Sequence, residues 1–342
     1  MGKNMSTSKS RPLLTFALIS YSQANFIREA VEGAFAQTYS PLEIILSDDR
    51  SPDNTFEIMQ EMANNYHGPH KIILNRNQVN LGIGGHINRI MQLSSGQMIV
   101  IAAGDDISVP ERVQRLFDVF ESSNGESKSI FSNNLLIDTK GSDCGVQITL
   151  PPNCSELVPE RIIEKKDLGI LPGSSHAWSR EVFDVFGPLL TPITCEDMVI
   201  PFRSALLGQI QYIDETLVKA RRHDNNISQY VLKDPLKHVK FQIFEKEAIF
   251  KNWLKDLEKY EAINPDNRKR VKLLRGRIFE LLICAQADIL LNNSSWVKRV
   301  LLLIGQILRG TPLRVIRHRI GIFLIPNVYL KYMFLKCKRR NH

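Results

Sequence analysis

Short apolar runs alternate with amphipathic stretches over the first third of the chain. Four apolar runs, rich in aliphatic residues and closed by polar ones, are typical of buried strands, at 14–21, 42–47, 71–74 and 98–102. Between them, apolar residues at helical spacing predict helices at 26–37, 55–66 and 86–93. The glycine-rich segment Gly82–Gly85 is predicted to be a turn before the third helix. This alternation predicts a doubly wound α/β fold with parallel strands.

The alternation weakens after Pro110, which is predicted to begin a helix that ends near Glu121. We expect a strand at 130–137, a loop at 139–159, and a second half that begins near Gly173. That half is predicted to contain a helix after Glu196-Asp197 and short strands at 211–213 and 217–220. From Pro235 the pattern becomes helical, with long amphipathic stretches at 238–257 and 268–291.

Two pairs of adjacent carboxylates close predicted strands: Asp48-Asp49 follows the second, and Asp105-Asp106 follows the fourth. Parallel strands bring their carboxyl ends to one edge of the sheet, and ligands of open α/β sheets bind in the crevice outside that edge. Four acids at this edge suit a cation, a sugar hydroxyl or a base N–H. The pattern therefore indicates a protein that handles a metal–nucleotide complex.

Composition places the chain among ordinary globular proteins, with 43% hydrophobic and 23% charged residues in 342. Five scattered cysteines without metal-ligand spacing favour a reducing compartment over a disulfide framework or a zinc site. The N-terminus lacks the apolar core of a signal peptide, so we expect a protein that is not secreted.

The net charge of +8 is unevenly distributed. Residues 296–342 contain eleven Lys or Arg and no acid; subtracting these from the 44 basic residues leaves 33 against 36 acidic ones, a net charge of −3 for the first 295 residues. An acidic main body argues against a nucleic-acid binder. The basic tail has two interpretations: an amphipathic segment that contacts anionic lipid, or a helical subdomain whose apolar face packs on the core while its charges are solvated.

Four short motifs follow one another in the first third of the chain: Gln-Thr-Tyr at 37–39, Asp-Asp-x-Ser-x-Asp at 48–53, Asn-Leu-Gly at 80–82 and Gly-Asp-Asp at 104–106, with Pro110 after it. In the order and spacing of these motifs, residues 13–122 resemble the N-terminal half of the family 2 glycosyltransferases of the GT-A fold. A looser resemblance continues through Gly173-Ser174-Ser175, Cys195-Glu196-Asp197 and the segment 221–228.

The resemblance implies a GT-A, Rossmann-like mixed sheet flanked by helices, followed here by a basic helical appendage. It divides the chain into a polar tail (1–12), a nucleotide-sugar-binding half (13–122), an acceptor-binding half (123–232) and a helical C-terminal region with possible membrane contact (233–342). The implied enzyme is an inverting glycosyltransferase of cell-surface polysaccharide synthesis, at the cytoplasmic face of the membrane. Its partners would be a nucleotide-sugar donor, with a UDP-sugar expected, and a glycan or lipid-linked acceptor.

The same resemblance assigns roles on the donor side. Ser20 and Tyr21 would line the base pocket, and Asp49 would accept a hydrogen bond from the base. Asp105 would lie near the ribose or donor sugar, and Asp106 would hold a divalent cation, Mn²⁺ or Mg²⁺, together with the diphosphate. The segment that contains His223 would lie near the diphosphate or metal, which makes His223 a second candidate metal ligand.

On the acceptor side, the resemblance makes Asp197 the general base and Glu196 an acceptor-binding residue. Each carboxylate also has a structural interpretation. Asp48 and Asp53 suit loop capping, and Glu196 and Asp197 suit a helix N-terminus. His176 and Trp178 would form either an acceptor platform or part of the packed core.

Two departures from the family pattern affect these expectations. Ala103 and Gly104 precede the second acid pair where many members have Asp-x, and Arg50 stands where Gly is usual. Metal use is therefore an expectation to test, and Arg50 could contact a phosphate or a base other than uracil. The alternative to a transferase is an inactive nucleotide-sugar- or membrane-binding protein with the same fold.

Overall fold

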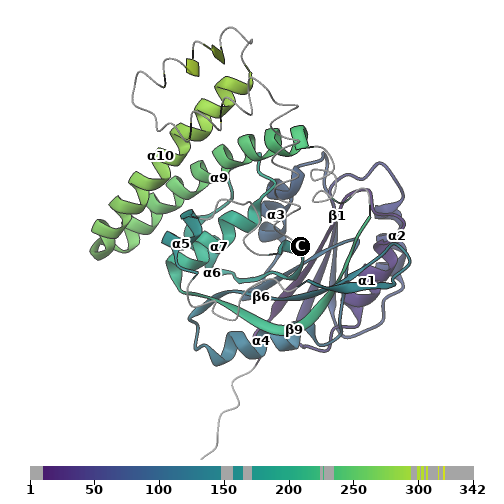
Figure 1. Cartoon of the computed structure of the whole chain (residues 1–342). Coiled ribbons are helices and arrows are strands. Elements are labelled where there is room, and N and C mark those ends of the chain that lie inside the picture. Colours follow the sequence, from purple (N-terminus) through teal and green to yellow (C-terminus); the bar gives the residue numbers. More distant parts are fainter. Residues whose placement is uncertain are drawn as a thin grey trace, which may run out of the picture. The chain divides into compact units, whose positions relative to one another are not determined.

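The computed structural model describes residues 11–147, 157–164, 172–223, 226 and 235–293, with isolated positions between 299 and 319 (Figure 1). The chain divides into two compact units, Met1–Arg221 with Glu258–Ile263, and Arg222–Leu257 with Asn264–His342. The first unit contains the sheet and both acidic pairs.

One mixed sheet is the centre of the first unit, with strand order β3-β2-β1-β4-β8-β6-β9-β5 and β7 paired to β6. Its strands are β1 (Leu14–Ser20), β2 (Leu42–Asp48), β3 (Lys71–Arg76), β4 (Met98–Ala103), β5 (Ile107–Ser108), β6 (Ser127–Ile137), β7 (Asp143–Gln147), β8 (Ala177–Ser179) and β9 (Gln209–Arg221). Strands β1 to β4 are parallel, whereas β8 runs antiparallel to β4 and β6. The prediction of a mixed α/β sheet is confirmed.

Helices cover both faces of this sheet: α1 (Ile27–Phe35), α2 (Thr55–Asn64), α3 (Gly82–Leu93), α4 (Arg112–Ser122), α5 (Pro159–Glu164), α6 (Glu181–Phe186) and α7 (Glu196–Leu207). Alternate residues of β1, β2 and β4 form one buried cluster with the apolar sides of α1, α2 and α4. Figure 1 shows α4 on one side of the sheet and α6 and α7 on the other. The order β2-β1-β4 reverses direction at β1, so the switch point of the sheet lies between β1 and β4.

Three local predictions are wrong. Gly82–Gly85 is the first turn of α3 and not a separate turn, because the carboxylate of Asp49 accepts hydrogen bonds from the N–H groups that begin this helix. The expected loop at 139–159 contains β7, and the two expected strands near 211–220 are one strand, β9. Residues 148–156 of that loop lie outside the described residues.

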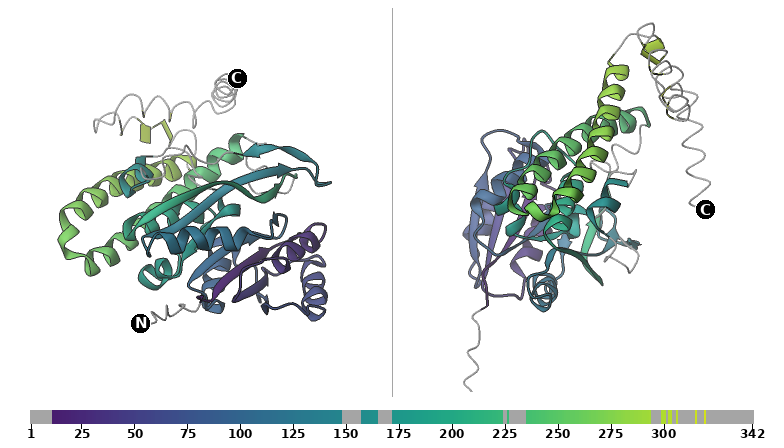
Figure 2. Two further views of the ribbon diagram at one scale, coloured as in Figure 1. Left: turned by 90° about the horizontal axis from the view of Figure 1, so that it is seen from below. Right: turned by 90° about the vertical axis from the view of Figure 1, so that its left-hand side faces the viewer.

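Two long helices follow the sheet, α9 (Pro235–Ile263) and α10 (Arg268–Asn292), joined through a short 3₁₀ turn at Pro265–Asn267. The second unit contains α10 and the part of α9 up to Leu257. They lie side by side (Figures 1 and 2), and Gln286 on α10 donates to Glu247 on α9. No helix in the described part of the chain combines the length and hydrophobicity needed to cross a bilayer. Most of the basic tail, 296–342, falls outside the described residues, although Leu303 is buried against Ile243 and Leu291.

Candidate active site

Strand register brings the two acidic pairs to one edge of the sheet. Ser20 at the end of β1 pairs with Asp48, and Ile19 pairs with Ala103 at the end of β4. Two further backbone hydrogen bonds continue the alignment, from Asp49 N to Ser20 O and from Gly104 N to Ile19 O, each 2.9 Å. The prediction that the acids meet at one sheet edge is confirmed, and that edge contains the switch point where ligands of such sheets bind.

The first acidic pair is occupied by hydrogen bonds within the protein. Asp48 is buried and accepts from Ser51 N at 2.9 Å and from the Ser51 hydroxyl. Asp49 is 3% exposed and accepts from Asn77 Nδ2 at 2.8 Å, Leu81 N at 2.8 Å and Gly82 N at 2.9 Å. Asp49 thus connects β2 to the start of α3, and its predicted contact with the base would use a lone pair beyond these three bonds.

Arg50 follows these acids in a backbone conformation that L residues rarely adopt. Its φ is +64°, a left-handed value that glycine adopts without strain, which explains why glycine suits this position. Its side chain is exposed, and it makes no hydrogen bond or ion pair within the described residues. An exposed guanidinium therefore stands next to Asp49 at the ligand-binding edge.

A polar network of Asn75, Ser47 and His86 extends from Asn77, which is a hydrogen-bond partner of Asp49. Asn75 donates to Asn77 Oδ1 at 3.0 Å and to the Ser47 hydroxyl at 2.9 Å. The same hydroxyl lies 2.7 Å from His86 Nε2 on α3. Burial lowers the pKa of His86 to about 4, although the charge of Asp49 acts in the opposite direction. His86 is therefore neutral at neutral pH and belongs to the scaffold of the site.

The second acidic pair lies in a tight turn between β4 and β5. Asp105 and Asp106 are each 7% exposed, and Asp106 Oδ1 accepts a hydrogen bond from Arg221 N at 2.8 Å. A β-carbon on Gly104 would lie 2.5 Å from Gln23 Oε1 and 2.8 Å from Ser20 Cβ, so only glycine fits between β1 and this turn. Gly104 occupies the x of the Asp-x-Asp-Asp pattern, so this steric constraint does not explain Ala103, which stands where many members have Asp.

Two buried arginines, which the sequence did not single out, hold this turn. The Arg221 guanidinium donates to Asp105 O at 3.1 Å and to Glu29 Oε2 at 2.9 Å, so it joins β9 and α1 to the acidic turn. Arg112 donates to Ile101 O at 2.8 Å and to Ser174 O at 3.0 Å. Burial lowers the pKa of Arg112 to about 9, and the charge of Asp106 opposes this shift.

Arg112 did leave a signal in the sequence. It is the first residue of α4, where the helix dipole disfavours a cation, so its place there is better explained by a partner outside the helix. Through its bonds to Ile101 O and Ser174 O, Arg112 connects β4 to the segment Gly173–Ser175.

Glu196 and Asp197 stand in the first turn of α7, as the sequence predicts, and both are half-buried. A β-carbon on Gly173 would lie 3.0 Å from Glu196 Oε1, so the Glu196 carboxylate lies against the backbone of this loop. Arg112 and Glu196 therefore both lie against the segment Gly173–Ser175. The helix N-terminus favours an anionic Asp197, and its role as general base stays a prediction.

The remaining candidates differ in accessibility. Ser20 is buried and donates to Ser47 O at 3.2 Å, whereas Tyr21 is 48% exposed. His176 and Trp178 are buried, with the His176 ring stacked on Phe131 at 4.0 Å, so they belong to the core and not to an acceptor platform. Asp53 caps the loop by accepting from Ala24 N and Thr55 N. His223, in the second unit, donates from its backbone N to Asn226 Oδ1 at 2.6 Å, and its metal role stays a prediction.

The donor set suits a cation shared with a diphosphate. Among the described residues, no group of three or more His, Cys, Asp or Glu side chains is arranged to hold a metal ion. A cation such as Mg²⁺ needs fewer, because one or two carboxylates plus phosphate oxygens and water complete its shell. Asp105 and Asp106 supply hard oxygen donors of that kind at the switch point.

Comparison with known proteins agrees with this geometry. Residues 15–127 match glycosyl transferase family 2. The N-terminal third of the chain therefore matches a family 2 glycosyltransferase domain. An uncharacterized glycosyltransferase of Nostoc sp. is 26% identical over 217 residues, which cover 62% of this chain and 66% of that protein. The chondroitin synthase of Escherichia coli is 30% identical over 136 residues, or 40% of this chain and 19% of that protein.

A solved mannosyltransferase from Pyrobaculum calidifontis, in complex with GDP-Man and Mn²⁺, has a similar structure. The TM-score is 0.51 at 16% identity, and the match covers 96% of this chain and 87% of that one. At this identity the likeness shows the fold. The GT-A fold that the sequence motifs predicted is confirmed, and so is the family 2 resemblance for residues 15–127, while donor, acceptor and residue roles are matters for proposal.

Proposed function

We propose that the chain is an inverting glycosyltransferase that moves a sugar from a nucleotide-diphosphate donor, with a UDP-sugar expected, to a hydroxyl of a glycan or lipid-linked acceptor. Cell-surface polysaccharide synthesis is the proposed process. One observation carries the proposal. The Asp105-Asp106 turn lies beside the end of β1 at the switch point, with Asp106 fixed by Arg221 N at 2.8 Å.

Each candidate residue has a task in this proposal. Tyr21 and Arg50, both exposed, would face the nucleotide, and Asp49 would hold the loop at 77–82 against the base site. Asp106 would hold a divalent cation whose charge, when bound, offsets that of the departing diphosphate. Asp197 would accept the proton of the attacking hydroxyl, and Glu196 would orient the acceptor.

Location at the cytoplasmic face of a membrane is part of the same proposal. Its motivation is the acid-free tail, with eleven basic residues between 296 and 342. A lipid-linked acceptor would also place the enzyme there.

Binding is the first test. Purified protein is heated with UDP, GDP or ADP, with and without Mn²⁺, and compared with Asp106→Ala and with a control, Asp118→Ala on α4. Ligands that bind only the folded state raise the melting temperature. We expect a Mn²⁺-dependent rise with one nucleotide that is lost in Asp106→Ala and kept in the control. The absence of a rise with every nucleotide would contradict the proposal.

Catalysis is tested separately with Asp197→Asn. A general base contributes roughly 10²–10⁴-fold to the rate, so transfer from the donor that binds should fall by that order while the thermal shift persists. Equal rates of sugar transfer by wild type and variant would show that Asp197 is not the general base. A donor that binds without any transfer would favour the inactive binding protein.

A further inference from the structure

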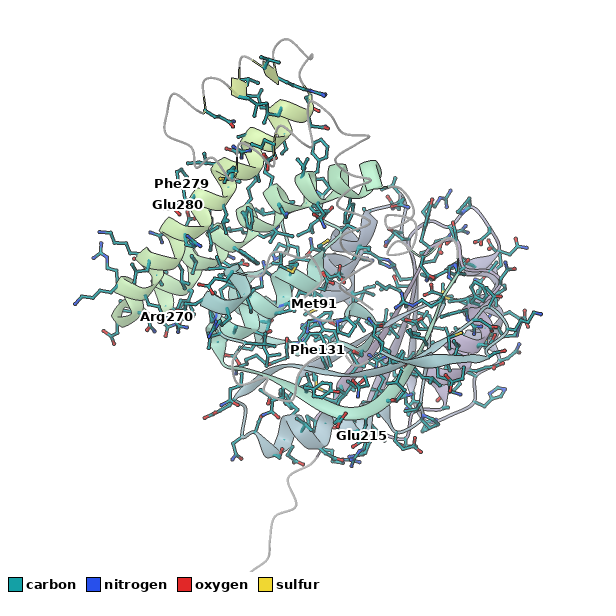
Figure 3. All side chains as sticks on the ribbon, in the orientation of Figure 1. Met91, Phe131, Glu215, Arg270, Phe279 and Glu280 are labelled. Carbon is teal, nitrogen blue, oxygen red and sulfur yellow. The ribbon has the colours of Figure 1, made fainter. Side chains whose placement is uncertain are left out.

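Helix α10 has apolar residues on two faces, and only one of them is covered. Val271, Leu274, Ile278, Leu282 and Ala285 are buried. Phe279, Ile283 and Leu290 are 55%, 53% and 47% exposed. Their spacings of four and seven residues place them on one face of the helix. Figure 3 labels Phe279 on this helix.

The same exposed face is basic in its first half. Lys272 lies seven residues before Phe279, and Lys269 lies fourteen before Ile283, so both continue the line of exposed apolar residues. Residues 268–277 contain six Lys or Arg and no acid. We name Lys269, Lys272, Phe279, Ile283 and Leu290 the α10 stripe.

The two acids of α10 do not offset this charge. Glu280 lies 3.6 Å from Arg277 Nη1, and Asp288 lies 2.6 Å from Arg319 Nε. Each acid thus already faces an arginine. Lys269 and Lys272 make no hydrogen bond or ion pair in the portion of the chain that the structure describes.

We propose that the α10 stripe docks on an anionic lipid surface. The lysines would bind phosphate headgroups, and the apolar half would enter the boundary between headgroups and acyl chains, with the helix in the membrane plane. This inference does not depend on the transferase activity. It assigns membrane contact to a described helix, in addition to the tail.

Charge complementarity favours anionic lipid over two other binding partners of the α10 stripe, a second copy of the chain and the chain's own tail. Seven-residue spacing also suits pairing of α10 with α10 of a second copy. Parallel pairing would place Lys272 of one copy against Lys272 of the other. Antiparallel pairing would place lysines of one copy over the apolar residues Phe279 and Leu290 of the other. The chain's own tail is basic and acid-free as well, with eleven Lys or Arg in 296–342. Neither occupant supplies the negative charge that the stripe requires.

The full-length protein is floated with vesicles of phosphatidylcholine, with or without phosphatidylglycerol. We expect binding only to the anionic vesicles. Removing two lysines in Lys269→Gln/Lys272→Gln should weaken it about thirtyfold, since each basic residue near such a surface contributes about fivefold. The variant Phe279→Ser/Ile283→Ser should weaken it by at least about tenfold.

Lys140→Gln/Lys219→Gln removes the same charge from two exposed lysines of the first unit and serves as control. Three results would overturn the proposal. They are an equal loss of vesicle binding in this control, full vesicle binding by both stripe variants, and no vesicle binding by the wild type. A wild-type dimer that Phe279→Ser/Ile283→Ser splits without any lipid binding would also overturn it. Nucleotide-induced thermal shifts, measured on every variant, separate a failure of this inference from a failure of the proposed transferase.

Discussion

Replacing Asp49 with alanine tests whether one carboxylate holds the loop between β3 and α3. Three hydrogen bonds disappear, from Asn77 Nδ2, Leu81 N and Gly82 N. Leu81 and Gly82 are exposed, so water replaces the carboxylate for these two groups. Asn77 is only 5% exposed, and a buried amide without its partner costs about 1–3 kcal/mol. With the loss of an anion at the N-terminus of α3, roughly 0.3–1 kcal/mol, we expect a total of about 1–4 kcal/mol.

The free energy of unfolding is measured by urea titration at neutral pH, with circular dichroism and tryptophan fluorescence followed together. Asp118→Ala, which truncates a half-exposed side chain on α4, is the control and should change stability by less than about 0.5 kcal/mol. Asp49→Asn should be intermediate, because its amide keeps an acceptor at the Oδ1 position for Asn77 and Leu81 but places a donor against Gly82 N. If Asp49→Ala lowers the free energy of unfolding no more than the control does, the carboxylate of Asp49 does not hold this loop.

Three other substitutions test separate parts of the site. His86 has a pKa of about 4 when folded and 6.5 as its ordinary value, so the unfolded chain binds the extra proton between these limits. Stability should therefore fall by up to about 3 kcal/mol as pH drops from 6.5 to 4, and His86→Gln should lose less in urea titrations at the two pH values. Gly104→Ala should abolish the nucleotide thermal shift through its clash with Gln23 and Ser20, whereas Gly276→Ala, in open space, should not. Arg50→Gly should raise the free energy of unfolding by about 1 kcal/mol, because glycine adopts a φ of +64° without strain. If calorimetry finds the same nucleotide affinity in this variant, Arg50 does not contact the nucleotide.

Local patterns were sufficient for the strands and helices whose side chains interact mainly with their own neighbourhood. The bounds predicted for β1, β2 and α10 are within one residue of the structure. Strand β9 was predicted as two pieces because Asp214-Glu215-Thr216 interrupts its apolar pattern. The structure explains the interruption: Asp214 accepts from Asn133, and Glu215 pairs with Arg115. Both partners lie far away in sequence, where no local pattern could indicate them.

The same distinction applies to the candidate site. The acids were found because each pair ends its own strand, and parallel pairing brings strand ends together. The role of Arg221 was not found, because Arg221 is 115 residues from Asp106 and contacts it only through the pairing of β9 with β5. Asp49 was found for its position, yet its bonds to Asn77 and to the start of α3 depend on tertiary structure.

These missed arginines change the electrostatics of the proposed donor site. Asp105, Asp106 and Glu29 lie near Arg112 and Arg221, and these five side chains carry three negative and two positive formal charges. Both guanidinium groups are occupied within the protein: Arg221 donates to Glu29 and to the backbone oxygen of Asp105, and Arg112 donates to the backbone oxygens of Ile101 and Ser174. They leave no surplus positive charge for a diphosphate, which is itself an anion. A cation that arrives with the nucleotide would supply that charge, which is the physical reason to expect Mn²⁺ or Mg²⁺ dependence from this turn and to test Asp106 first.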